Sequence, residues 1–181
     1  LEVKGALTVA PDGALVVKED VDLELGKYTQ GIFTSLINKG NCTIDGNLTI
    51  QTYSYVSMTN EGILEVKGDV TQTGNAGGDV YMSNEDSVFY IGGDLTVGVA
   101  SRWHVTGGTV VLNGLEQQSI KNVSIYNMHV QNSKGIKFES DISVYGTLNM
   151  NSYAIESNGY CLNVFSNAFL SEKTVYPKIV V

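Results

Sequence analysis

Apolar and polar residues alternate along this chain in short runs, and one pattern recurs: apolar-x-apolar-x-Gly-x-apolar-Thr-apolar. Its copies, with small departures, are Leu1–Val9, Cys42–Ile50, Leu64–Gln72, Phe89–Val97 and Ile142–Met150. Alternation with period two is typical of β-strands with one buried face, so each copy predicts two short strands that meet at the glycine. No stretch has the sustained i, i+3, i+4 apolar spacing of a helix, and we expect an all-β chain.

A second element precedes this pattern at a nearly fixed distance. Val56–Asn60 and Val80–Asn84 are close copies, and Thr34–Asn38 is a weaker one. Each final Asn lies eight residues before the motif glycine that follows it, or nine in the last copy. Two independent elements that keep their register indicate an internal repeat of about 22 to 25 residues. The repeat is clearest over 34–97 and degenerate over 98–137.

This repeat predicts a parallel β-solenoid, wound as a right-handed β-helix, that forms one domain over 1–181. A unit of two or three short strands cannot bury its apolar face alone, whereas stacked copies bury a continuous core and pair equivalent strands. Right-handed winding follows the general preference of parallel strand crossovers. A β-sandwich or barrel is the main structural alternative, but a long repeat with two unlike half-motifs suits coils better than antiparallel hairpins.

The polar and glycine positions that recur in the repeat are interpreted as structural. Glycine tolerates sharp backbone bends and asparagine bonds local backbone, so both residue types predict corners between strands. The predicted corners are Gly5, Gly46, Gly68, Gly93, Gly146, Asn38, Asn60 and Asn84. Stacking equivalent positions also predicts an outward row of Thr8, Thr49, Thr71 and Thr96, which closes with Asn149. We interpret that row as side chains that hydrogen-bond along the solenoid.

Charge narrows the range of partners. The net charge is −8, and the 11 basic residues, among which Arg102 is the only arginine, are scattered rather than clustered. A phosphate backbone or an anionic bilayer needs a basic patch, so we expect neither nucleic acid nor a membrane surface as partner. No apolar run approaches the ~18 residues of a transmembrane span, so membrane insertion is not expected. The chain opens directly in a strand-like run, which suggests a mature fragment or an excised domain.

The two cysteines are expected to be buried free thiols. Cys42 and Cys161 lie 119 residues apart, about five coils. Because coils advance by ~4.8 Å each, this separation of ~24 Å far exceeds the ~7 Å that a disulfide allows between Cα atoms.

Candidate catalytic and metal-binding groups are sparse. His104 and His129 are 25 residues apart, about one coil, but two ligands do not make a metal site. A cation could relieve the repulsion between Asp69 and Asp94, yet Ca²⁺ takes six to eight oxygen ligands. The close acidic pairs, Glu19-Asp20, Asp20/Asp22 and Glu85-Asp86, lie in turn-like stretches where a solvated surface explains them. We therefore expect no metal, no cofactor and no catalytic site.

Exposed aromatic residues in a row are a means of gripping sugars and protein surfaces. The ten tyrosines are Tyr28, Tyr53, Tyr55, Tyr81, Tyr90, Tyr126, Tyr145, Tyr153, Tyr160 and Tyr176. Tyr90 and Tyr145 occupy outward positions of the motif. Contact with a glycan or with another surface protein is thus one hypothesis, and amphipathic covering of the strands is the simpler one.

The segments 66–71 and 93–97 resemble repeats of large extracellular β-solenoid proteins of bacteria. The stretches 104–119 and 123–130 are similar to the same broad group. The resemblance implies a secreted or surface-attached segment with a structural or adhesive role, and it transfers no catalytic residue.

The leading hypothesis is a non-enzymatic structural or adhesive solenoid segment, such as a stalk, fibre or adhesin element at a bacterial surface. One alternative is a carbohydrate-binding or polysaccharide-processing β-helix domain. Another is a filament subunit that self-associates end to end. In that case Leu1, inside a repeat, and the apolar segment Pro177–Val181 would present exposed strand edges.

Overall fold

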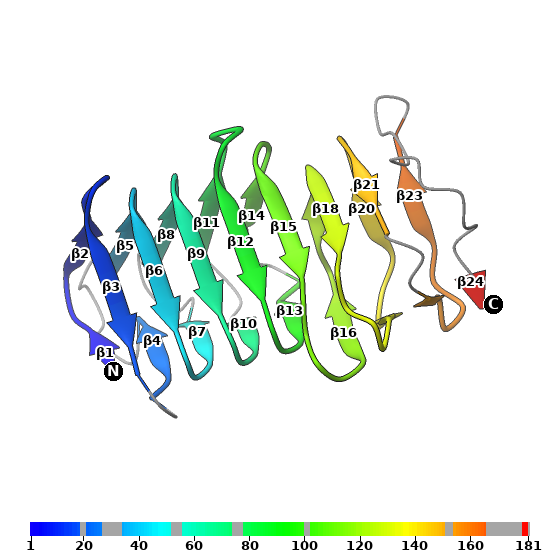
Figure 1. Ribbon diagram of the computed structural model, residues 1–181, viewed down its shortest axis with the longest axis horizontal. Helices are drawn as coiled ribbons and strands as arrows, with labels where there is room; N and C mark the ends of the chain where they lie inside the picture. Colours follow the sequence, from blue (N-terminus) through cyan, green and yellow to red (C-terminus); the bar gives the residue numbers. More distant parts are fainter. Residues whose placement is uncertain are drawn as a thin grey trace.

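The chain forms a parallel β-solenoid of stacked coils (Figure 1). The computed structural model describes residues 1–18, 21–26, 34–51, 56–73, 78–99, 102–150, 154–165 and 179–180. Throughout these ranges the regular structure is β-strand, without helix, and every strand pair is parallel. The predicted fold class is confirmed.

Four parallel sheets run along the solenoid, here named A to D. Sheet A holds β1 (Glu2–Val3), β4 (Leu23–Leu25), β7 (Leu48–Gln51), β10 (Val70–Thr73), β13 (Leu95–Val97), β16 (Gln118–Lys121), β19 (Ile136–Phe138), β22 (Ile155–Glu156) and β24 (Ile179–Val180). Sheet B holds β2 (Ala6–Val9), β5 (Thr34–Asn38), β8 (Val56–Asn60), β11 (Gly78–Met82) and β14 (Arg102–Val105). Sheet C holds β3 (Ala14–Val17), β6 (Asn41–Ile44), β9 (Ile63–Val66), β12 (Val88–Ile91), β15 (Thr109–Leu112), β18 (Asn127–Val130) and β21 (Leu148–Asn149). Sheet D holds β17 (Ser124–Ile125), β20 (Ile142–Val144) and β23 (Leu162–Val164).

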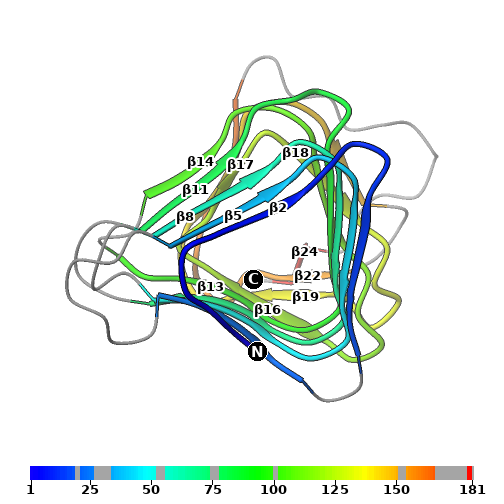
Figure 2. The same ribbon diagram turned by 90° about the vertical axis from the view of Figure 1, so that its left-hand side faces the viewer.

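The cross-section is triangular. From β1 to β22 each coil passes through sheet A, then through B or D, and then through C before it returns to A (Figure 2). Seen from the N-terminal end, the chain turns clockwise as it recedes, so the helix is right-handed (Figure 2).

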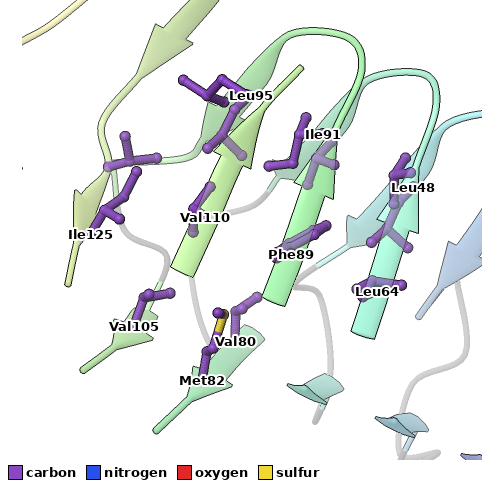
Figure 3. Close-up of a cluster of buried hydrophobic side chains, with 14 of the residues drawn as sticks. Leu48, Leu64, Val80, Met82, Phe89, Ile91, Leu95, Val105, Val110 and Ile125 are labelled. Atoms are coloured by element: carbon purple, nitrogen blue, oxygen red, sulfur yellow. The ribbon is translucent and has the colours of Figure 1, made fainter. Parts of the chain in front are cut away.

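One hydrophobic core follows the axis. In most strands alternate residues point inward, as in β12, where Phe89 and Ile91 are buried and Val88 and Tyr90 alternate with them on the outer side. Figure 3 shows how Leu48, Leu64, Val80 and Leu95 meet such side chains from three sides. Burial of each large apolar side chain contributes roughly 1.5–3 kcal/mol, and no single coil could enclose these residues alone.

Coil length changes partway along the solenoid. In sheet A, register partners lie 25 residues apart from Val70 to Leu95 and again from Leu95 to Ile120, within the predicted range. Beyond Ile120 the spacing falls to 18 residues at Phe138. The change coincides with the replacement of sheet B by sheet D. Only two residues separate β16 from β17, whereas four separate β10 from β11.

The step between wide and narrow coils is joined by asparagine side chains. β14 is the last strand of sheet B, and no described strand pairs with it on the side of β17. The Asn122 Nδ2 atom donates to the Val97 carbonyl at 2.9 Å, and Asn127 Nδ2 donates to the Gly108 carbonyl at 2.9 Å. These bonds tie the two kinds of coil together. The change of backbone path after Ile120 thus falls within 98–137, the stretch where the repeat is degenerate.

Two glycines of the motif lie at corners other than the expected one. Gly46, Gly68 and Gly93 all join sheet C to sheet A. In contrast, Gly5 joins sheet A to sheet B, and Gly146 joins sheet D to sheet C. Every corner links two alternating strands, so the motif identifies a corner without identifying which of the three it is.

Candidate functional site

The outward side chains form rows along the solenoid, and the most regular row lies at the corner between sheets C and A. We call it the corner row: Asp22, Asn47, Asp69, Asp94 and Ser119. In each step, a side-chain Oδ1 atom accepts a hydrogen bond from the backbone N–H of the next member, at 2.7–2.8 Å. The acidic residues of the corner row thus take part in a continuous series of hydrogen bonds between neighbouring coils. The oxygens that a cation between Asp69 and Asp94 would use are partly engaged by these amides.

The glycines that precede Asn47, Asp69 and Asp94 make room for this row. A Cβ atom added to Gly68 would lie 2.3 Å from Asn47 Oδ1, and one added to Gly93 would lie 2.2 Å from Asp69 Oδ1. Neither glycine has a positive φ, whereas Gly5 has a φ of 100° and open space around it. Gly68 and Gly93 are therefore required by close packing between coils, and only Gly5 by its backbone angle.

The predicted asparagine corners divide into two kinds. Asn38 and Asn60 are register partners at the ends of β5 and β8, fully buried, and Asn38 Nδ2 donates to Asn60 Oδ1 at 2.8 Å. Asn60 Nδ2 in turn donates to the Val88 carbonyl at 3.0 Å.

Asn84 is an exposed turn residue rather than a third member of this pair. Val80 pairs with Met58, which puts Asn84 two residues beyond the level of Asn60. The connection from β11 to β12 is longer than the one from β8 to β9, and a shift of two residues keeps the same face inward. The Asn84 side chain bonds the Glu61 carbonyl at 3.1 Å and the Asp86 amide at 3.1 Å.

The predicted threonine row is shorter than expected. Thr49, Thr71 and Thr96 are register partners on the outer side of sheet A, where Glu24 precedes them and Lys121 follows. Thr8 does not belong to this row, because it lies in sheet B beside Ile37. Likewise, Asn149 lies in sheet C beside His129. Both were assigned through motif copies that occupy different corners.

A buried polar network, which the sequence did not predict, lies where the coils change in length. The Gln118 side chain accepts hydrogen bonds from the Gly114 amide at 2.8 Å and from Asn132 Nδ2 at 2.9 Å, and it donates to the Ile91 carbonyl at 2.9 Å. Gln118 and Asn132 are 2% and 0% exposed. Neither belongs to a repeated pattern, so the sequence contained no signal for them.

The two histidines lie on different sheets. His104 is in β14, where its ring stacks on Tyr81 with centroids 5.0 Å apart and its Nε2 lies 3.7 Å from Asp79 Oδ1. His129 is in β18 of sheet C. Across the described ranges, no cluster of three or more His, Cys, Asp or Glu residues could hold a metal ion.

A shallow hollow of about 210 Å³ lies at the corner between sheets C and A, over Gly92. Glu65, Lys67 and Asn113 contribute its polar walls, and Leu115, 85% exposed, stands at its rim. The Lys67 ammonium contacts Asp45 Oδ1 at 2.6 Å, and this hydrogen bond and charge raise the pKa of the lysine. The hollow is smaller than the cavities of ~300 Å³ or more that enclose drug-sized ligands.

The cysteines differ from the expectation in one respect. Cys42 is buried, and burial raises the pKa of its thiol to about 11. Cys161 is free as expected but exposed, since it precedes β23, where inward residues of the coil are only partly covered.

The outer side of sheet D carries two uncharged rows. Ser124, Ser143 and Asn163 are register partners and form the first row. Two residues further along each coil, Tyr126, Tyr145 and Phe165 form the second, with 36%, 43% and 46% of their surfaces exposed. The rings of Tyr145 and Phe165 stack with centroids 4.5 Å apart and planes 10° apart. We call these six residues the sheet D face.

Some predicted features lie outside the described residues. These are Glu19, Asp20, Tyr28, Tyr53, Tyr55, Tyr153 and Tyr176. Of the apolar C-terminal segment, Ile179–Val180 forms β24 and pairs with β22. The described part of the chain contains no helix long and apolar enough to cross a membrane.

The fold defines the chain as a right-handed parallel β-helix. No protein-family model matches it, and neither a curated protein nor a solved structure gives a match.

Proposed function

We propose that the chain is a non-enzymatic structural segment, a stiff spacer within a secreted or surface-attached bacterial protein. The observation that carries this proposal is the corner row, in which each coil is tied to the next by a side-chain hydrogen bond of 2.7–2.8 Å. These bonds add to the backbone ladders and all run along the axis. Such bonds hold neighbouring coils in register, which a stiff spacer requires.

Other side chains extend the same arrangement to the remaining corners. The Thr147 amide bonds Asn127 Oδ1 at 2.8 Å, and the Cys161 amide bonds Asp141 Oδ1 at 2.8 Å. In a solenoid each coil contacts only its neighbours, so stiffness depends on every such junction. The bacterial surface location rests on the resemblance of the repeats and is part of the proposal.

Distance measurements between spin labels test the spacer role. With one label on exposed Val16 and one on exposed Leu115, we expect a single narrow distance distribution that denaturant broadens only at global unfolding. Insertion of a second copy of residues 70–94 should lengthen that distance by ~4.8 Å, one coil. A broad distribution in native buffer would overturn the proposal. So would sustained release of reducing ends from any polysaccharide by the purified chain, which would establish an enzyme.

A further inference from the structure

The sheet D face differs from the other outer faces in both charge and aromatic content. Five of the twelve exposed large hydrophobic side chains in the described ranges fall between Tyr126 and Phe165. Neither row of the face contains a charged residue, although the whole chain has a net charge of −8. Single exposed apolar residues are ordinary on a protein surface, whereas a contiguous group with a polar border marks an interaction site.

We propose that the sheet D face binds an uncharged linear glycan, whose chain lies along the solenoid axis. Three features support this partner: the aromatic row, the parallel row of hydroxyl and amide groups, and the neutrality of both. Serine and asparagine side chains can donate and accept hydrogen bonds, as sugar hydroxyls require. The aromatic rings supply apolar contact area beside them, and the Tyr126 and Tyr145 hydroxyls add polar groups at its edge.

The face is organised before a ligand arrives. Tyr145 and Phe165 fix one another by stacking, and the backbone of each is hydrogen-bonded to the coil before it. Two rings that already occupy one arrangement lose little side-chain freedom on binding, which favours affinity. The exposed apolar surface of these rings is where we expect the sugar rings to pack.

The spacing favours a glycan over a peptide. Equivalent positions on neighbouring coils recur every ~4.8 Å, whereas an extended peptide advances ~3.3 Å per residue and would fall out of step within three coils. A peptide that adds as a strand needs an unpaired sheet edge, and in sheet D the edges are β17 and β23, whereas β20 at the centre of the face is paired on both sides. Successive rings of a β-1,4-linked sugar chain recur at a spacing close to that of the coils.

Affinity electrophoresis of the whole chain tests the proposal, with gels that contain hydroxyethyl cellulose, xylan or glucomannan as probes. We expect retardation in at least one neutral polysaccharide and little effect of added salt. Tyr126→Ala and Asn163→Asp should each weaken binding about tenfold, the effect of one lost aromatic or polar contact. Tyr90→Ala, on sheet C, is the matched control and should bind like the unmodified chain.

Two variants of different chemistry keep the test independent of folding, because Asn163 is exposed and its replacement removes no buried contact. Thermal unfolding of each variant confirms that the solenoid is intact. Absence of retardation by all three polysaccharides, or equal retardation of the sheet D variants and the control, would overturn the proposal. Selective capture of extended peptides from a random library by the unmodified chain would do the same. None of these results bears on the spacer role, which depends on the corner row and is measured by the label distances.

Discussion

Replacement of Asn60 by alanine, compared with the same change at Asn84, separates what the repeat suggests from what the packing requires. The two residues end near-identical motif copies, and the sequence gives them the same role. In the structure Asn60 is 1% exposed and bonded at both ends of its amide, whereas Asn84 lies in an exposed turn. The two alanine variants should therefore differ strongly in stability.

The magnitude follows from the bonds that are lost. Asn60→Ala removes the hydrogen bond accepted from Asn38 Nδ2 at 2.8 Å and the one donated to the Val88 carbonyl at 3.0 Å. Asn38 Nδ2 keeps its hydrogen bond to the Ile63 carbonyl at 2.8 Å, so this donor group loses one of its two partners and retains the other. A net bond contributes roughly 0.5–1.5 kcal/mol, and a buried partner left unpaired costs roughly 1–3 kcal/mol. We expect a loss of about 2–4 kcal/mol for Asn60→Ala and about 0.5 kcal/mol for Asn84→Ala.

Urea and thermal unfolding, followed by far-ultraviolet circular dichroism, measure both variants. At ~2–4 °C per kcal/mol for a chain of this size, Tm should fall by about 5 to 15 °C for Asn60→Ala and by about 2 °C for Asn84→Ala. A double-mutant cycle with Asn38→Ala should give a coupling energy of roughly 0.5–3 kcal/mol, as expected for side chains in contact. Equal losses at Asn60 and Asn84, or zero coupling between Asn38 and Asn60, would refute the reasoning.

Three further predictions concern the corners and the core. The Cβ added in Gly68→Ala would lie 2.3 Å from an atom of the preceding coil, and we expect this variant to lose about 1–3 kcal/mol of stability. In Gly13→Ala the nearest atom to the added Cβ lies at 3.1 Å, and the expected loss is under about 1 kcal/mol. Equal urea midpoints for the two variants would contradict the steric argument. Asn38 Oδ1 is buried without a hydrogen bond, and Val9 is the register partner of Asn38 in the preceding coil. An asparagine at position 9 could donate to this oxygen, so Val9→Asn should be no less stable than Val9→Ala. A much less stable Val9→Asn variant would show that the row formed by Asn38 and Asn60 cannot be extended by a third asparagine. Burial raises the pKa of the Cys42 thiol to about 11, so the folded state favours the protonated form, and its stabilising effect, complete below the ordinary thiol pKa, should be lost as pH rises toward 11. Urea titrations from pH 8 to 11 should show this decrease, and Cys42→Ala should remove it; an unchanged decrease in the variant would assign it to other groups.

Much of the fold could be predicted from the sequence because each coil must meet the same local requirements. Alternating apolar residues must face a shared interior, and glycine or asparagine must turn the chain, so the period and the parallel pairing are both reflected in residue order. Thr49, Thr71 and Thr96 were placed correctly on this basis, within consecutive coils of the clear repeat.

The tertiary structure decided which corner each motif occupies and which polar residues carry the packing. Thr8 and Gly146 match the motif locally but belong to other sheets, because all corners join similar strands and only the path around the core distinguishes them. The requirement for Gly68 comes from an oxygen of Asn47, 21 positions earlier and one coil away, a contact that no local pattern records. The sheet D face is likewise assembled from two residues of each of three coils, and it exists only once those coils have stacked. The sequence by itself determined the repeating unit, since that depends on neighbouring residues, and stacking determined every feature that joins one unit to the next.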